Sequence, residues 1–311
     1  MLNELRVGIV IPTLNGDGRF VECLAGVSAQ SMIPHRRLVI DSSSTDDTVA
    51  RAKAAGFEIK EISRADFSHG GTRQWAAECL CDCDILVYLT QDAILASPQS
   101  LAQIVRSFDD PRVAVAYGRQ LPHRGAKPME AHARKFNYGE TSQLKDSAAS
   151  GKIGAKVFFC SNSFAAYRRS VLVELGGFNR HLILGEDMEF AARSLTAGYA
   201  NCYCAEATAF HSHDYSWPEQ FRRYFDVGVF DAANKWMTDK FGSHVGTGAR
   251  FVRSELQYLL IKAPAQIPRA LLQTIAKACG YRLGLREKWL PVSMKRKLSM
   301  SQSYWRSSSS G

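Results

Sequence analysis

The chain has 311 residues, of which 46% are hydrophobic and 22% charged, and its formal net charge is +9. This composition is ordinary for a globular protein, and no run of about 18 apolar residues is present, which argues against a membrane-spanning helix. The first residues lack the basic and apolar regions of a signal peptide, so we expect a cytoplasmic protein.

The excess positive charge belongs to the end of the chain. From Arg250 onward, 12 Lys and Arg residues accompany only two acids, Glu255 and Glu287. We expect residues 1–245 to form the main domain and residues 246–311 a basic helical extension. Such an extension suits an anionic membrane surface at the inner face of the cell membrane, or a homodimer contact. Nucleic-acid binding is not expected, because no base-reading motif accompanies the charge.

Strands and helices alternate over the first 62 residues. Apolar runs predict strands at residues 6–15, 37–41 and 57–62, and helical periodicity predicts helices at 20–30 and 48–55. This order is typical of a doubly wound α/β sheet with right-handed crossovers. Neither GxGxxG nor GxxxxGK[ST] is present, so the sheet is not predicted to bind a dinucleotide or to carry a phosphate-binding P-loop.

A polar loop with two glycines spans residues 65–74 and precedes a predicted helix at 74–80. Free backbone N–H groups at a helix start, together with Arg73, can bind an anion. The alternative is a simple turn in which Thr72 caps the helix.

The apolar run from Ile85 predicts a buried strand that ends at Asp92, just as the strand at 37–41 ends at Asp41. In an open α/β sheet the ligand crevice lies at these carboxyl ends. A helix at 98–108 and a strand at 113–117 follow. Residues 118–154 show little periodicity, and we interpret them as an insertion or mobile loop with a possible helix at 131–138.

The next segment predicts a strand at 161–168 and a helix at 169–175. A further helix begins at Glu186-Asp187, and a strand at 203–210 ends in His211-Ser212-His213. Alternate residues of an extended chain share one side, so both imidazoles could reach one point. Carboxylates and imidazoles thus gather around an acid-lined crevice suited to a metal, a diphosphate and a catalytic base.

In these motifs the chain resembles the inverting glycosyltransferases of family 2, over about residues 5–240. The matching motifs are Pro12-Thr13-Leu14-Asn15, Asp41 with the turn at 42–46, Gln91-Asp92-Ala93 and Gly185-Glu186-Asp187. The resemblance implies the GT-A fold, a Rossmann-like mixed α/β sheet flanked by helices, with the helical C-terminal extension added. One departure is clear: the family's usual Asp-x-Asp is here Thr90-Gln91-Asp92.

The resemblance also implies roles for the matching residues. Asp187 would be the general base, Asp92 would hold Mg²⁺ or Mn²⁺ with His211 or His213, and Asp41 would meet the nucleoside. The other residues expected to bind the donor are Pro12, Thr13, Asn15, Ser43, His69, Gly70, Arg73, Gln91 and Ala93. Glu186 and Trp217 are expected near the acceptor. Alternatively, Glu186 is an ordinary acidic residue at the start of a helix.

The loop at 66–73 and the C-terminal region are similar to those of bacterial rhamnosyltransferases that build O-antigen and other surface polysaccharides. This similarity implies transfer of L-rhamnose from dTDP-β-L-rhamnose, with inversion, to a lipid-linked or other saccharide acceptor. A UDP-hexose donor is the first alternative. A sugar nucleotidyltransferase would need a basic loop after the first strand, which residues 12–18 lack. A catalytically silent binding subunit is the remaining alternative.

Overall fold

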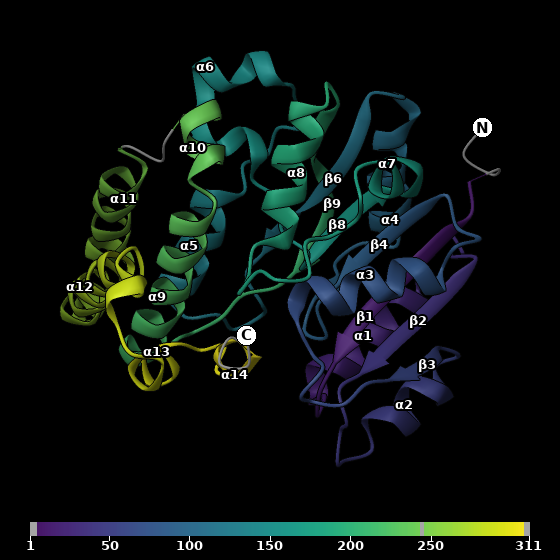
Figure 1. The fold of residues 1–311 in the computed structure, drawn as a ribbon, viewed down its shortest axis with the longest axis horizontal. Coiled ribbons are helices and arrows are strands. Elements are labelled where there is room, and N and C mark those ends of the chain that lie inside the picture. Colours follow the sequence, from purple (N-terminus) through teal and green to yellow (C-terminus); the bar gives the residue numbers. More distant parts are fainter. Residues whose placement is uncertain (1–4, 243–245, 308–311) are drawn as a thin grey trace.

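The strands that end at Asp41 and Asp92 lie in one half of a mixed sheet in the computed structural model, which describes residues 5–242 and 246–307 (Figure 1). Four parallel strands make up this half, in the order β3-β2-β1-β4. They are β1 (Val7–Thr13), β2 (Arg36–Asp41), β3 (Glu58–Glu61) and β4 (Ile85–Leu89). Their carboxyl ends therefore meet at one edge, as the doubly wound pattern predicts.

The second half of the sheet mixes strand directions. Next to β4 lies the antiparallel β8 (Phe164–Arg168), followed by β6 (Val113–Leu121) and β9 (Ala200–Phe210), which run parallel to each other. The short strands β5 (Ile94–Leu95) and β7 (Gln143–Lys145) both pair antiparallel with β9. Within the described ranges the sheet has nine strands, and the predicted mixed α/β architecture is confirmed.

Helices cover both faces of the sheet because successive strand residues point to opposite sides. Ile9 and its alternating neighbours pack with α1 (Gly18–Ser28) and α4 (Ser100–Arg106). Val10 belongs to the opposite core, with α3 (His69–Cys79), α7 (Arg169–Glu174) and α8 (Glu186–Thr196). The helix α2 (Thr48–Ala54) connects β2 to β3.

Two sequence-based predictions need correction. Helix α3 begins at His69 rather than at residue 74, because Ser68 Oγ accepts the Gly71 N–H at 3.0 Å and caps the helix there. Thr72 is therefore inside the helix. Residues 118–154 are not one loop: they contain the end of β6, α5 (Pro128–Asn137), β7 and α6 (Ser150–Ile153).

The C-terminal part of the structure is helical, as predicted. It comprises α9 (Trp217–Ala233), α10 (Lys235–Phe241), α11 (Thr247–Lys262), α12 (Ile267–Gly284), α13 (Val292–Leu298) and α14 (Tyr304–Ser307). Short 3₁₀ helices lie at Ser107–Asp109, Ser147–Ala149, Gly154–Phe158, Pro264–Gln266 and Glu287–Trp289. The predicted domain boundary at residue 245 falls on a segment outside the described residues. No helix of the described part has the length and hydropathy to cross a membrane.

Helix α12 crosses α9 at close range, because glycines meet there. A Cβ atom added to Gly280 would lie 2.2 Å from the Phe221 carbonyl oxygen, and one added to Gly228 would lie 2.3 Å from that of Tyr281. The extension is thus packed directly on a helix of the main domain. Its last described helix, α14, lies between the C-terminal helices and the sheet (Figure 1).

Candidate active site

A pocket of about 490 Å³ opens at the carboxyl ends of β1, β2 and β4, where an open α/β sheet binds its ligand. Its walls come from three strand ends, from the loop before α3 and the first turns of that helix, and from one residue near the C-terminus. The lining residues are Pro12, Thr13, Leu14, Ser42, Arg64, Phe67, His69, Arg73, Thr90, Gln91 and Ser303. Pro12, Thr13, His69, Arg73 and Gln91 were predicted from the sequence to bind the donor.

Gln91, the middle residue of the Thr90-Gln91-Asp92 motif, joins the ends of two neighbouring strands. Its Oε1 accepts the Thr13 hydroxyl at 2.7 Å and the Leu14 N–H at 2.8 Å, while its Nε2 donates to the Leu14 carbonyl at 3.2 Å. An ionised carboxylate could accept the first two bonds but could not donate the third. The amide therefore ties the end of β4 to the end of β1.

Asp41 and Asn15 shape the neighbouring turns. The Asp41 carboxylate is buried and accepts the Ser44 N–H at 2.8 Å and the Ser44 hydroxyl at 2.5 Å. Asn15 accepts the Thr45 N–H at 2.9 Å through Oδ1. Ser43 was expected to bind the donor, but it is exposed and donates to the Ile62 carbonyl, and its neighbour Ser42 lines the pocket instead.

Asp92, His211 and His213 lie together beyond the end of β4. Asp92 Oδ1 is 3.6 Å from His211 Nε2, and Asp92 Oδ2 is 3.7 Å from His213 Nδ1. One ligand atom from each residue falls within 4.8 Å of the others. Burial lowers the pKa of both imidazoles, and the neutral ring is the form that binds a metal. One carboxylate and two imidazoles at this spacing fit a divalent cation.

The orientation of His211 is set by Gln120. Arg134 donates to Gln120 Oε1, and because arginine can only donate, this atom must be the amide oxygen. The same oxygen lies 2.9 Å from His211 Nδ1, which must then carry the ring proton. The lone pair of His211 Nε2 is left facing Asp92, as a metal ligand requires.

Replacing Gln120 with Leu should therefore weaken Mn²⁺ binding by about 10- to 100-fold, the usual effect of losing an outer partner of a metal-binding histidine. Gln120→Glu keeps an oxygen for His211 Nδ1–H and should bind at least as tightly as the original protein. Isothermal titration with Mn²⁺ measures both. Equal affinity of the Leu and Glu variants would contradict the role of Gln120.

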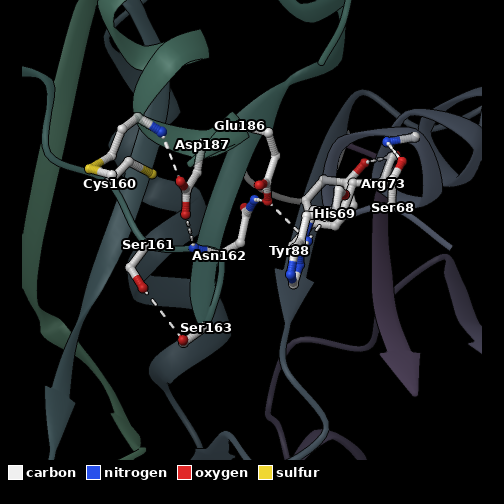
Figure 2. A network of polar contacts seen from close by, with 12 residues as sticks. Ser68, His69, Arg73, Tyr88, Cys160, Ser161, Asn162, Ser163, Glu186 and Asp187 are labelled. Atoms are coloured by element: carbon white, nitrogen blue, oxygen red, sulfur yellow. Dashed lines mark hydrogen bonds and ion pairs between the residues drawn. The ribbon is translucent and has the colours of Figure 1, made fainter. Parts of the chain in front are cut away.

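Asp187 is the second residue of α8 and lies beside Asn162 (Figure 2). Its Oδ2 accepts the Asn162 N–H at 2.9 Å and its Oδ1 accepts the Met188 N–H at 2.8 Å. Burial, with the nearby charge of Glu186, raises the pKa of Asp187 to about 6. A carboxylate of this pKa is well suited to accept a proton near neutral pH.

Glu186 is the first residue of α8 and forms a buried ion pair. Its Oε1 lies 2.9 Å from Arg73 Nη1 and also accepts the Asn162 Nδ2–H at 2.9 Å (Figure 2). Although burial acts to raise it, the charges of Arg73 and His69 keep the pKa of Glu186 below its usual value. Arg73 Nε has no hydrogen-bond partner within the part of the chain that the structure describes, so one donor remains for a ligand.

The short segment 161–163 joins Asp187 to the cluster of Asp92, His211 and His213. Asn162 contacts both Asp187 and Glu186, and the next residue, Ser163, places its Oγ 3.4 Å from His211 Nε2. Residues from β4, α8 and the end of β9 are thereby brought to one place. Asp41 reaches the same edge of the sheet, with its carboxylate turned into its own loop.

Three further residues expected from the sequence to bind substrate do not line this pocket. Gly70 packs against the 179–180 loop, where an added Cβ would be 1.9 Å from the Asn179 carbonyl oxygen. Ala93 is fully buried in the core. Trp217 starts α9, is 52% exposed and lines a separate shallow hollow with Lys297.

Sequence reasoning missed several contacts of the site. Asn162 falls in a predicted strand and Gln120 in a predicted loop, and a single amide gives no periodic signal of a further role. Phe67 lies in the polar loop predicted at 65–74 and Arg64 immediately precedes it, so the sequence indicated their neighbourhood though not their contact with the pocket. Nothing in the sequence pointed to Ser303.

Comparison with known proteins identifies relatives over nearly the whole chain. The family described as "Glycosyl transferase family 2" matches residues 8–176. The O-antigen chain rhamnosyltransferase RfbN of Salmonella typhimurium is 48% identical over 302 residues, covering 97% of this chain and 96% of the relative. WbaN of Salmonella anatum, also an O-antigen chain rhamnosyltransferase, is 48% identical over 298 residues, covering 96% of this chain and 95% of the relative.

Solved structures share the fold at low sequence identity. A mannosyltransferase from Pyrobaculum calidifontis, crystallised with GDP-Man and Mn²⁺, superposes with a TM-score of 0.59 at 18% identity and covers 98% of this chain and 86% of that chain. The structure of S. aureus TarS in complex with UDP superposes with a TM-score of 0.54 at 13% identity. The match covers 92% of this chain and 91% of that chain. Both are evidence of a shared architecture.

Proposed function

The chain belongs to glycosyltransferase family 2, and from this membership we propose that it transfers L-rhamnose from dTDP-β-L-rhamnose to a saccharide acceptor of an O-antigen or related surface polysaccharide. The enzyme is a glycosyltransferase; the donor and acceptor are the proposed part. Identity of 48% to two O-antigen chain rhamnosyltransferases over nearly their full length is the observation that carries the proposal.

The donor would lie in the pocket at the ends of β1, β2 and β4. Arg64 and Arg73 line it and offer donors to the diphosphate, while Pro12, Leu14 and Phe67 supply apolar walls for the nucleoside. Mg²⁺ or Mn²⁺, if held by Asp92, His211 and His213, would offset the negative charge that develops on the leaving diphosphate.

Asp187 is proposed to remove the proton from the acceptor hydroxyl. Two backbone N–H groups fix its oxygens, and its pKa of about 6 leaves it ionised at neutral pH and still a usable base. The deprotonated oxygen attacks the anomeric carbon as the bond to the diphosphate breaks. One such displacement inverts the anomeric configuration.

The donor is tested with a panel of nucleotide sugars and a defined lipid-linked oligosaccharide acceptor. Mass spectrometry should find a deoxyhexose added from dTDP-β-L-rhamnose and no addition from UDP-glucose or UDP-galactose. Transfer from a UDP-hexose alone would establish the alternative donor, and no transfer from any donor would favour a silent binding subunit. A nucleotidyltransferase would instead release diphosphate from a nucleoside triphosphate.

We further propose that the extension lies on an anionic membrane surface, close to a lipid-linked acceptor. One side of α12 exposes Leu271, Leu272 and Ile275, and Trp289 is 85% exposed nearby in sequence. The two acids of this region are withdrawn from the surface, since Glu255 is buried and Glu287 pairs with Lys295. Apolar side chains among an excess of cations match the interface of an anionic bilayer.

Flotation with vesicles tests this surface. The protein should float with phosphatidylglycerol-containing vesicles, and Ile275→Asp should reduce the bound fraction several-fold. Ile33→Asp, which changes an 81% exposed isoleucine in the main domain, is the matched control and should leave flotation unchanged. If Ile275→Asp instead splits a homodimer and leaves flotation intact, the same surface is a subunit contact.

A further inference from the structure

One residue of the pocket comes from a distant part of the chain. The other lining residues all lie between Pro12 and Gln91, whereas Ser303 belongs to residues 299–306, which we call the C-terminal strap. The strap follows α13 and ends in α14, which lies between the C-terminal helices and the β1–β2 half of the sheet (Figure 1). The chain's last described residues therefore return to the site.

The first anchor of the strap is Asp226 on α9. Its side chain is fully buried, and its Oδ2 accepts the Met300 N–H at 3.0 Å and the Ser301 N–H at 3.2 Å. Burial raises the pKa of Asp226, while hydrogen bonds from Ser299, Met300 and Ser301 act in the opposite direction. A buried carboxylate that accepts two N–H groups of a non-helical segment fixes the position of that segment.

The second anchor is Trp305, which is only 4% exposed and belongs to the main hydrophobic core. Its ring lies 6.5 Å from that of Phe225, and Lys295 Nζ sits 5.0 Å from its centroid. Ser303 stands between the two anchors, exposed to solvent and facing the pocket. The contacts of Asp226 before it and of Trp305 after it therefore fix the position of Ser303 at the pocket.

We propose that the C-terminal strap is part of the donor-binding site, with Ser303 forming the wall of the pocket opposite the strand ends and contacting the bound nucleoside diphosphate sugar. This inference rests on the proposed function in so far as that pocket receives the donor. Asp226 acts through the strap and is a positioning residue, whereas Ser303 touches the ligand directly.

The test is nucleotide binding, measured by isothermal titration with dTDP and with UDP. Ser303→Trp places a large ring in the pocket and should weaken binding of the preferred nucleotide at least tenfold. Gln302→Trp adds the same ring at the exposed neighbouring position and should bind like the original protein. Ser303→Ala, which removes only one hydroxyl, should weaken binding about two- to tenfold.

The positioning role of Asp226 has its own readout. Asp226→Leu removes the acceptor of two strap N–H groups and should weaken nucleotide binding, whereas Asp226→Asn keeps one carbonyl oxygen and should restore much of it. Circular dichroism melting identifies any variant that has lost its fold.

The outcomes separate the strap from the donor assignment. Original affinity in Ser303→Trp would overturn the role of the strap. Binding of UDP in place of dTDP, again weakened by Ser303→Trp, would overturn the rhamnose donor and support the strap. Absence of any nucleotide binding by the unaltered protein would overturn both.

Discussion

Replacing Asp187 with Asn is expected to lower kcat about 10²- to 10⁴-fold, because general base catalysis contributes an acceleration of that order. Asn is nearly isosteric and can still accept one of the N–H bonds from Asn162 and Met188, so the loop should keep its shape. Affinity for the nucleotide should change little. Initial rates with saturating donor, followed by mass spectrometry of the product, measure the effect.

The control for this variant is Asp239→Asn, which changes a 62% exposed aspartate on α10 and should leave kcat unaltered. Wild-type turnover in Asp187→Asn would remove Asp187 from the role of base. The proposal that the pocket binds the nucleotide would stand even then, because donor binding does not depend on Asp187.

The same carboxylate predicts the pH dependence. Burial and the charge of Glu186 raise the pKa of Asp187 to about 6, and only its ionised form can accept a proton. Activity should therefore fall as the pH drops through about 6 and level off above about 7. The acid limb should be absent from the residual activity of Asp187→Asn, and its persistence there would assign the titration to another group.

The second large effect is expected on stability. Glu186→Gln leaves the guanidinium of Arg73 buried without its counter-charge, and the free energy of unfolding should fall by about 3–5 kcal/mol. Both side chains of the pair are less than a tenth exposed, so water cannot replace the lost carboxylate without rearrangement. Urea denaturation monitored by tryptophan fluorescence measures the change.

A matched ion pair on the surface provides the comparison. Arg51 Nε lies 2.8 Å from Asp47 Oδ2, and the two side chains are 38% and 59% exposed. Asp47→Asn should lower the free energy of unfolding by at most about 1 kcal/mol. An equally small loss in Glu186→Gln would mean that Arg73 finds another partner or water. Glu186→Gln should also move the acid limb of activity to lower pH, since the Glu186 charge contributes to the raised pKa of Asp187.

Much of the fold followed from local patterns in the sequence. The β-branched runs that became β1, β2 and β4 are strong strand signals, and the alternation of strands with amphipathic helices permits few topologies. Parallel strands bring their carboxyl ends to one edge whatever the details of packing. The position of Asp92, and the start of α8 at Glu186, were therefore predictable from sequence.

Local contacts that compete over a few residues were harder to predict. The start of α3 depended on whether Ser68 or Thr72 caps the helix, and both residue types favour that position. Residues 118–154 gave no clear period because α5 packs only part of one face and β7 has three residues at the sheet edge. In such segments tertiary packing decides between conformations of similar intrinsic free energy.

Sequence alone determined the class of fold and the edge of the sheet that carries the candidate site, because these follow from short-range periodicity and from the geometry of parallel strands. The candidate base and metal ligands followed from the resemblance of the sequence motifs to those of family 2 glycosyltransferases. Only the tertiary structure decided how the polar groups pair: that Gln91 ties β4 to β1, that Gln120 orients His211, that Asp41 is turned into its own loop, and that Ser303 reaches the pocket. Apart from the local Asp41 contact, these pairings join residues far apart in the chain, and a polar side chain carries no mark of its distant partner.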